Sequence, residues 1–497
     1  MNYVELVVFI IYLAFMLGIG VVFFFKSKGG GEKDYFLGGR QMGPWVSALS
    51  AGASDMSAWV LMGLPASIYA YGMGQTWIAI GLAIGYALSW IFEAPRLRRF
   101  SIAANDSITI PQYLTNRFLS KSKALQILCA LIFLVAYTVY AASSIKACGT
   151  LFNTVIGIDS TVAMYIAAII IIAYTFLGGF SAVCWTDFFQ GILMFFCVLA
   201  VPTIAIFSMG GPTEFFSQVE AFNPNFLNML VDGATGVPYT AMGIISLLAW
   251  GLGYFGQPHI LVRFMGISSP QAIKKSRRIA TVWVLISLTA AIMIGVSGRM
   301  FLGDGLLLND GNQETIYISM VAKIFPVFIA GIFLSAILAA IMSTADSQLL
   351  VTASAITEDF YHNKIRKNAS EKELMWVSRG CVMAVAIIAV LIATNQNSTI
   401  LGLVSYAWGG FGSAFGPLVL CSLFWRRTNK QGAYAGIIVG GVVDLVWAQL
   451  SGGIFDLYEI VPGFVFGLLA IVVVSLLTPA PTKAVTDEFD SYHHCVE

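Results

Sequence analysis

Charged residues are scarce in this chain. Asp, Glu, Lys and Arg make up 11% of its 497 residues, and 58% of the residues are hydrophobic, whereas a soluble domain carries about 25% charged residues. The formal net charge is +1 and no long basic block is present, so nothing indicates a nucleic-acid partner. We expect a polytopic membrane protein whose few charges lie outside the hydrocarbon or in functional sites.

Metal-binding histidine pairs, nucleophile motifs and an attached soluble domain are also missing. The chain has four histidines, and its seven cysteines show no zinc spacing, redox spacing or disulfide framework. The apolar run 4–25 is too long for a signal-peptide core and lacks a basic flank and a cleavage motif. These absences predict a retained first helix, no enzymatic activity, no organic cofactor and no obligatory protein partner.

Apolar runs of about 20 residues predict thirteen membrane-spanning helices and hence an all-α fold. The predicted spans are 3–25, 45–71, 75–95, 124–157, 161–180, 187–208, 237–265, 276–302, 316–356, 374–394, 398–425, 431–450 and 456–478.

Alternate loops differ in charge. Lys and Arg occur in the loops near 26–40, 96–99, 274–278, 364–372 and 426–430, and are absent from 72–74, 158–160, 209–236, 303–315, 395–397 and 451–455. The positive-inside rule therefore places the N-terminus outside the cell membrane and the C-terminus in the cytoplasm, which requires an odd number of spans.

Two of the spans are interrupted. The second contains the small polar run Ser50–Ala58 around Asp55, and the seventh contains three glycines and a proline within 250–258. A carboxylate at bilayer depth indicates an ion or substrate pathway, and paired interruptions in two halves indicate a transporter site near the midplane. The interrupted spans are five apart. Because successive spans cross the membrane in alternate directions, spans separated by an odd number run in opposite directions. The second five-helix unit is therefore inverted relative to the first. The glycines alone would also fit close helix packing.

The ninth span carries a third polar cluster, Ser343 to Gln348. Ser343 and Ser347 are four residues apart and share a helix face. Hydroxyl and carbonyl oxygens are suitable ligands for a small cation, although isolated hydroxyls also bond back to the carbonyl four residues earlier. Trp250 and Tyr254 have the same spacing and suit a small zwitterion with an apolar ring.

Five long motifs resemble those of the sodium:solute symporter family, and within it the bacterial sodium/proline symporters. They are SALSAGASDMSAWVLMGLP (47–65), FLGGFSAVCWTDFFQG (176–191), WGLGYFGQPHILVRFM (250–265), LSAILAAIMSTADSQLL (334–350) and LGLVSYAWGGFGSAFGP (401–417). The resemblance extends from about Asp34 to Leu477. It implies a leucine-transporter-type core of two inverted five-helix repeats, with one extra helix before it and two after it.

This resemblance and the span count together predict the domain organisation. The expected parts are an N-terminal helix and cytoplasmic loop (1–44), the first repeat (45–208), an extracellular loop (209–236), the second repeat (237–425), two further helices (426–478) and a cytoplasmic tail (479–497).

The resemblance also implies the roles of individual residues. The expected sodium ligands are Ala53, Met56 and Ala340 through carbonyls and Ser343 and Thr344 through hydroxyls, with Asp55 as an acid needed for sodium use. The expected proline-binding residues are Ser57, Ala58, Tyr140, Trp250, Tyr254 and Pro258. Asp187, Asp346 and Ser347 resemble a second cation position or exit route, and Arg40 matches an arginine beside an inner gate. From the residues alone, Asp187 fits a solvated acid at a helix end equally well.

Two positions depart from the family pattern. Ala58 stands where the proline symporters have glycine, which would make the cavity smaller by one methyl group, and Asp346 adds a carboxylate where some members have serine. The predicted function is inward transport of L-proline coupled to sodium by alternating access. A symporter of the same fold for another small organic solute and an ion channel are the alternatives.

Overall fold

Most of the residues that the structure describes are helical. The computed structural model describes residues 3–26, 37–120, 122–177, 180–307, 312–395 and 398–494. Nine helices in these residues are long and apolar enough to cross a membrane. The four other predicted spans correspond to the two interrupted ones and to two further helices, α9 and α19. The structure therefore confirms an all-α polytopic membrane protein.

The helices follow one another in an order that occurs twice. The first half contains α1 (Tyr3–Lys26), α3 (Pro44–Asp55), α4 (Leu64–Tyr71), α5 (Thr76–Leu88), α6 (Ala94–Ala103), α7 (Ile110–Arg117), α8 (Ala124–Ile156), α9 (Ser160–Leu177), α10 (Phe180–Ser208) and α11 (Pro212–Phe222). The second half contains α12 (Ala241–Leu248), η5 (Ala249–Gly256), α13 (Pro258–Gly266), α14 (Pro270–Leu302), α15 (Ile316–Ile324), α16 (Val327–Ser354), η7 (Ala355–Ile365), α17 (Glu371–Ala393), α18 (Ile400–Phe424), α19 (Lys430–Trp447), α20 (Ile460–Leu477) and α21 (Lys483–His494). In the first half, the broken span α3–α4 and the long span α5–α6 precede the short helix α7, and the spanning helices α8, α9 and α10 follow it. In the second half, the broken span α12–α13 and the long helix α14 precede the short helix α15, and α16, α17 and α18 follow it. Two five-helix repeats predict this order.

The second span breaks just after Asp55. The N–H group of Met56 donates to the carbonyl of Gly52 and ends α3, and the backbone of Met56 (φ −80°, ψ 75°) lies outside the helical region. The freed carbonyl of Asp55 accepts hydrogen bonds from the N–H of Ser57 at 2.9 Å and from the indole N–H of Trp59 at 3.1 Å. Local donors therefore satisfy part of the unwound backbone, as burial in a membrane requires.

The seventh span breaks at Gln257. Its backbone is extended (φ −80°, ψ 105°), and Pro258 starts α13 at a position where a missing N–H group is tolerated. The preceding segment η5 is a tighter, 3-10 helix. Glycine allows η5 to touch α5 directly: a Cβ atom on Gly85 would lie 2.1 Å from the carbonyl oxygen of Gly251, and one on Gly251 would lie 2.2 Å from that of Gly81.

Two helices begin or end differently from the predicted spans. The span predicted at 316–356 consists of the separate helices α15 and α16, because Pro326 forces Phe325 into an extended conformation (φ −110°, ψ 148°). The sixth span begins at Phe180, two turns before the predicted 187. In these turns the hydroxyl of Thr186 donates to the carbonyl of Ala182, so this polar residue stays within the helix.

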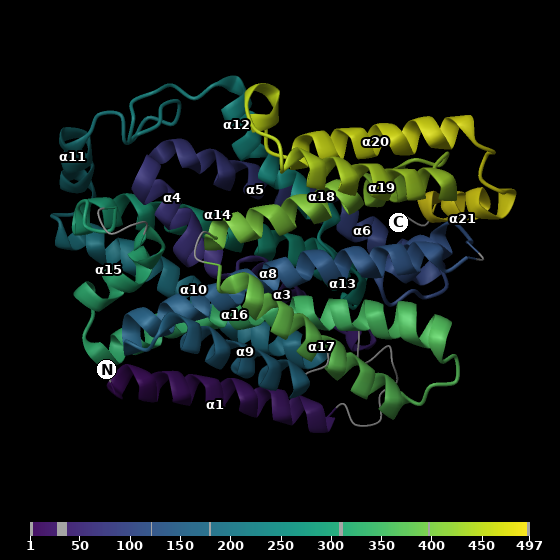
Figure 1. Ribbon diagram of the computed structural model, residues 1–497, viewed down its shortest axis with the longest axis horizontal. Helices are drawn as coiled ribbons and strands as arrows, with labels where there is room; N and C mark the ends of the chain where they lie inside the picture. Colours follow the sequence, from purple (N-terminus) through teal and green to yellow (C-terminus); the bar gives the residue numbers. More distant parts are fainter. Residues whose placement is uncertain are drawn as a thin grey trace.

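The two ends of the molecule carry different elements (Figure 1). α11 and α15 lie at one end with the start of α1, and α21 lies at the other end. α21 falls in the predicted polar tail, where the sequence indicated no helix. Its residues Val485 and Phe489, four apart, are buried, and Asp490 forms an ion pair with Arg426 at 2.6 Å. Phe489 packs on Phe100, with ring centroids 5.6 Å apart.

Candidate functional site

A hydrogen bond joins the two breaks. The hydroxyl of Tyr254, on η5, donates to Oδ2 of Asp55 at 2.6 Å, and both side chains are completely buried. Tyr254 is held between the rings of Tyr86 and Trp408, with centroids 5.1 and 5.0 Å away. Oδ1 of Asp55 has no hydrogen-bond partner among the residues that the structure describes. An unpaired carboxylate oxygen at this depth is costly unless a further group or ion binds it.

The ninth span adds its hydroxyls beside the first break. The hydroxyl of Ser343, on α16, donates to the carbonyl of Ala53 at 2.8 Å and also lies 3.3 Å from the carbonyl of Ala340. Thr344 is fully buried, and its hydroxyl has no partner among the described residues. Two of the predicted sodium ligands, Ala53 and Ala340, thus lie within hydrogen-bond distance of a third, Ser343, and a fourth follows directly along the helix. Such a group of neutral oxygens next to a carboxylate suits a small hard cation.

The predicted substrate residues divide into two groups. Tyr140, on α8, faces Ser57 and Asp55, and the hydroxyls of Tyr140 and Ser57 are both buried. Trp250 lies farther along η5, where its ring is 5.6 Å from that of Tyr458 and its carbonyl accepts from the indole of Trp408 at 2.7 Å. Buried hydroxyls beside an aromatic ring offer polar groups to a small organic solute.

A buried arginine occupies the predicted second cation position. Arg263, on α13, forms an ion pair with Asp187 of α10 at 2.9 Å and also donates to the hydroxyls of Ser50 and Ser347. The hydroxyl of Ser50 donates to the same carboxylate oxygen at 2.7 Å. Asp187 is 0% exposed, so its interpretation as a solvated acid at a helix end is wrong. The ion pair and the hydrogen bonds of Arg263 therefore join α3, α10, α13 and α16.

Asp346 adds a second carboxylate to this cluster. Its Oδ1 atom accepts from the hydroxyl of Ser347 at 3.3 Å, whereas Oδ2 is buried and has no partner among the described residues. One guanidinium therefore lies near two buried carboxyl groups, and it forms its ion pair with Asp187.

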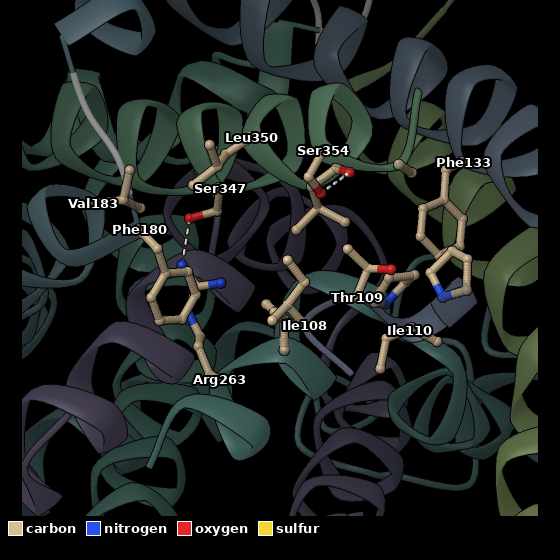
Figure 2. Close-up of a pocket in the computed structure, with 15 residues that line it drawn as sticks. Ile108, Thr109, Ile110, Phe133, Phe180, Val183, Arg263, Ser347, Leu350 and Ser354 are labelled. Carbon is tan, nitrogen blue, oxygen red and sulfur yellow. Dashed lines mark hydrogen bonds between the residues drawn. The ribbon is translucent and has the colours of Figure 1, made fainter. Parts of the chain in front are cut away.

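A narrow cavity lies next to the cluster (Figure 2). Arg263 and Ser347 form one end, and Ile108, Thr109 and Ile110, near the start of α7, lie farther along it. Its free volume for water is about 10 Å³, enough for about one molecule. Pro258 lines this cavity, so the structure places this predicted substrate residue next to the arginine cluster.

Arg40 ties several elements together at the same end of the molecule. Its guanidinium donates to the carbonyl of Met265 at 2.6 Å, to the carbonyl of Ser107 at 2.8 Å and to the hydroxyl of Ser101 at 3.0 Å. It also pairs with Asp106 at 3.1 Å. These bonds join the segment before α3 to the ends of α6 and α13 and to the segment before α7. Arg40 therefore links these four segments.

Comparisons with known proteins agree with this geometry. The model of the sodium:solute symporter family matches residues 35–440. The chain belongs to the sodium:solute symporter family. It is 47% identical over 479 residues to the high-affinity proline transporter PutP of Bacillus subtilis, which covers 96% of this chain and 99% of that protein. It is 46% identical over 495 residues to the sodium/proline symporter of Escherichia coli, with 98% and 97% covered.

A solved structure of another protein has the same fold as this chain. The substrate-bound outward-open state of a Na+-coupled sialic acid symporter matches it with a TM-score of 0.79 at 23% identity, covering 97% of this chain and 99% of that one. The leucine-transporter-type architecture predicted from the motifs is thereby confirmed. The co-transported ion of this family is sodium.

Sequence reasoning missed Arg263, Trp408 and Tyr86 in this family member. Arg263 is a single charge within the apolar stretch HILVRFM, and the rule that a charge at bilayer depth is functional would have found it. Trp408 and Tyr86 gave no comparable signal, because one aromatic residue among many does not show which ring packs against Tyr254.

Proposed function

We propose that this protein takes up L-proline by coupling it to the inward movement of sodium, and that it is not an enzyme. The observation that carries the proposal is the contact between α16 and the break after α3, where the hydroxyl of Ser343 lies 2.8 Å from the carbonyl of Ala53 beside Asp55. The names of the relatives support proline as the solute.

In this proposal sodium bridges α3 and α16. It is held by the carbonyls of Ala53, Met56 and Ala340 and by the hydroxyls of Ser343 and Thr344, while Asp55 supplies negative charge. The ion would replace the direct hydrogen bond from Ser343 to Ala53. Fixing α3 against α16 in this way stabilises the outward-open state that admits the solute.

Proline would bind where the two breaks meet. Ser57, Tyr140 and Tyr254 would offer hydroxyls, and Ala58, Trp250 and Pro258 would complete the site. The amine and carboxylate of a zwitterion need polar partners, and the half-helix that begins at Pro258 has a positive end suited to a carboxylate. The aromatic rings around Tyr254 suit an apolar pyrrolidine ring.

The second cation position would serve ion release. Ser347 and Arg263 line the narrow cavity in Figure 2, and they contact Asp346 and Asp187, respectively. A sodium ion leaving α3 would meet these oxygens next, and Arg263 would balance the carboxylates after it has left.

The energetics fit one sodium ion per cycle. One charge crossing about 100 mV gains roughly 2.3 kcal/mol, and a tenfold inward sodium gradient adds about 1.4 kcal/mol. Together they support an accumulation of roughly several hundredfold for a neutral solute. The protein would lie in the cell membrane with its N-terminus outside and α21 in the cytoplasm, as the basic loops indicate.

Uptake into proteoliposomes tests the proposal. We expect radiolabelled L-proline to accumulate only under an inward sodium gradient, and excess unlabelled proline to block it while other amino acids do not. Accumulation in the absence of sodium would contradict the coupling. Lack of proline uptake by folded protein, together with sodium-dependent uptake of another solute, would contradict the substrate.

Ala58→Gly is expected to widen the range of solutes. The methyl group of Ala58 would be lost from the site, and a difference of one methylene in a pocket changes specificity about 10- to 200-fold. We expect uptake of L-pipecolate, whose ring is one methylene larger, to rise at least tenfold relative to proline. The ratio of kcat/KM values measures this effect. An unchanged ratio would show that Ala58 does not limit the cavity.

Arg40→Ala is expected to weaken the inner closure. The variant loses the bonds from Arg40 to Met265, Ser101, Ser107 and Asp106, and a charged hydrogen bond contributes about 1.5–3 kcal/mol. We expect steady-state proline accumulation to fall about tenfold, with efflux accelerated and sodium-dependent binding retained. Arg40→Lys, which keeps the charge and loses the planar fork, serves as the control and should be intermediate. Unchanged accumulation by Arg40→Ala would contradict a gating role.

A further inference from the structure

An apolar groove runs along the outside of the helix bundle between α10 and α14. We call it the α10–α14 groove. One part has a volume of about 480 Å³ and includes Leu49, Phe195, Arg278 and Trp283, and an adjoining part of about 340 Å³ extends to Met293. The two parts share Ile286. Both volumes fall in the range of ligand-binding pockets.

The groove is open to the lipid along its length and closed at its base. Phe196 and Val282, on its two walls, are 66% and 56% exposed, whereas Trp283 at the base is 7% exposed. From Arg278 to Met293 the groove follows α14 for roughly 22 Å at 1.5 Å per residue. One leaflet of the hydrocarbon core is about 15 Å thick, so the groove is long enough for a single extended acyl chain.

Basic residues gather at one end of the groove. Lys274, Lys275, Arg277 and Arg278 lie in the first three turns of α14, and no acidic residue occurs between 268 and 303. Among the described residues, none of these four forms an ion pair. Arg278 is exposed and lines the groove itself. Trp45, half exposed at the same end, is a residue typical of the membrane interface.

Charge and shape together identify the occupant. We propose that the α10–α14 groove binds one anionic phospholipid, with its phosphate on Arg278 and one acyl chain along Phe195, Val282 and Ile286. Basic pockets between helices on the cytoplasmic side are the usual sites of anionic head groups. A groove without the arginine would hold any annular lipid, whereas the basic end selects a net negative head group.

The bound lipid would touch the sodium-binding half of the protein. Trp283 packs so closely on α3 that a Cβ atom on Gly52 would lie 2.6 Å from the indole ring. The carbonyl of Gly52 ends α3 by accepting from Met56, directly beside Ala53 and Asp55. An acyl chain that fills the groove therefore supports, through Trp283, the turn that carries the candidate sodium ligands.

Retention of lipid by the purified full-length protein tests the proposal. The protein is incubated in detergent with equal amounts of palmitoyl-oleoyl phosphatidylglycerol and phosphatidylcholine, and the bound lipid is counted by native mass spectrometry. We expect the wild-type protein to retain phosphatidylglycerol preferentially. Arg278→Gln should reduce this preference about fivefold, the effect of one basic residue at an anionic surface. Arg277→Gln, which changes a neighbouring charge outside the groove lining, should keep most of it.

A second variant separates groove binding from surface attraction. Val282→Trp fills the groove without changing any charge, and it should abolish the retention of phosphatidylglycerol. Equal losses in Arg277→Gln and Arg278→Gln would overturn the proposal, because general attraction to the basic cluster would explain them. Unchanged retention by Val282→Trp, or equal retention of the two lipids by the wild-type protein, would also overturn it and show annular binding only. Each variant is first compared with the wild type by thermal unfolding.

Discussion

Asp55→Asn is expected to abolish sodium-driven proline uptake. Asparagine keeps the size of the side chain and can still accept the hydrogen bond from Tyr254, but it supplies no negative charge to a cation held by neutral oxygens. Removing one partner of a buried charge pair costs about 3–5 kcal/mol, which corresponds to a fall in the initial rate of at least about a hundredfold. Initial rates in proteoliposomes at several sodium concentrations measure the loss.

Tyr254→Phe is the matched control for this prediction. It removes the 2.6 Å hydrogen bond to Asp55 and keeps both the carboxylate and the aromatic ring between Tyr86 and Trp408. Loss of one hydrogen bond to a charged group corresponds to about 10- to 100-fold, and sodium dependence should remain. If Asp55→Asn kept the full sodium dependence of the wild type, the assignment of the sodium site to this break would be wrong.

Arg263→Gln is expected to destabilise the protein strongly. The guanidinium pairs with Asp187 at 2.9 Å and also donates to Ser50 and Ser347, so its removal leaves two buried carboxylates, Asp187 and Asp346, without a cation. Breaking a buried ion pair on one side costs about 3–5 kcal/mol. We expect the thermal unfolding midpoint in detergent to fall by several degrees and sodium to restore part of it.

The double variant Arg263→Gln/Asp187→Asn checks the cause. It removes both charges of the pair, so it should be more stable than Arg263→Gln alone, as removal of a complete buried pair is often nearly neutral. The difference between the double variant and the sum of the single variants gives the coupling energy. Purely additive effects would mean that the ion pair does not stabilise the fold.

The sequence predicted the spanning helices and both breaks for clear physical reasons. The length of an apolar run decides whether a helix can cross the bilayer, and Gly and Pro around 250–258 make a continuous helix costly. The break after Asp55 was indicated by a small polar run with a carboxylate inside a hydrophobic segment, where polar groups are costly. Ser343 and Ala53 could be brought together only through the family resemblance, because no local pattern links residues 290 positions apart.

Other features depended on information that the sequence does not show directly. α21 forms in a polar tail because two apolar residues, Val485 and Phe489, meet a surface made by Phe100 of α6, and this surface exists only after folding. α10 begins at Phe180, before the predicted 187, and its buried Asp187 is neutralised by Arg263, a partner that no local pattern indicates. In both cases the partner lies far away in the chain.

The direct contact of α5 with η5 has a consequence for observing transport. Gly81 and Gly85 touch the backbone of Gly251 without intervening side chains, so no soft layer separates the two segments. A displacement of Trp250 or Tyr254 during the cycle is therefore transmitted to α5 as a rigid movement. Ile84, also on α5, is 52% exposed toward the lipid. A spectroscopic probe attached there would report the state of the central site from outside the bundle, without entering the site.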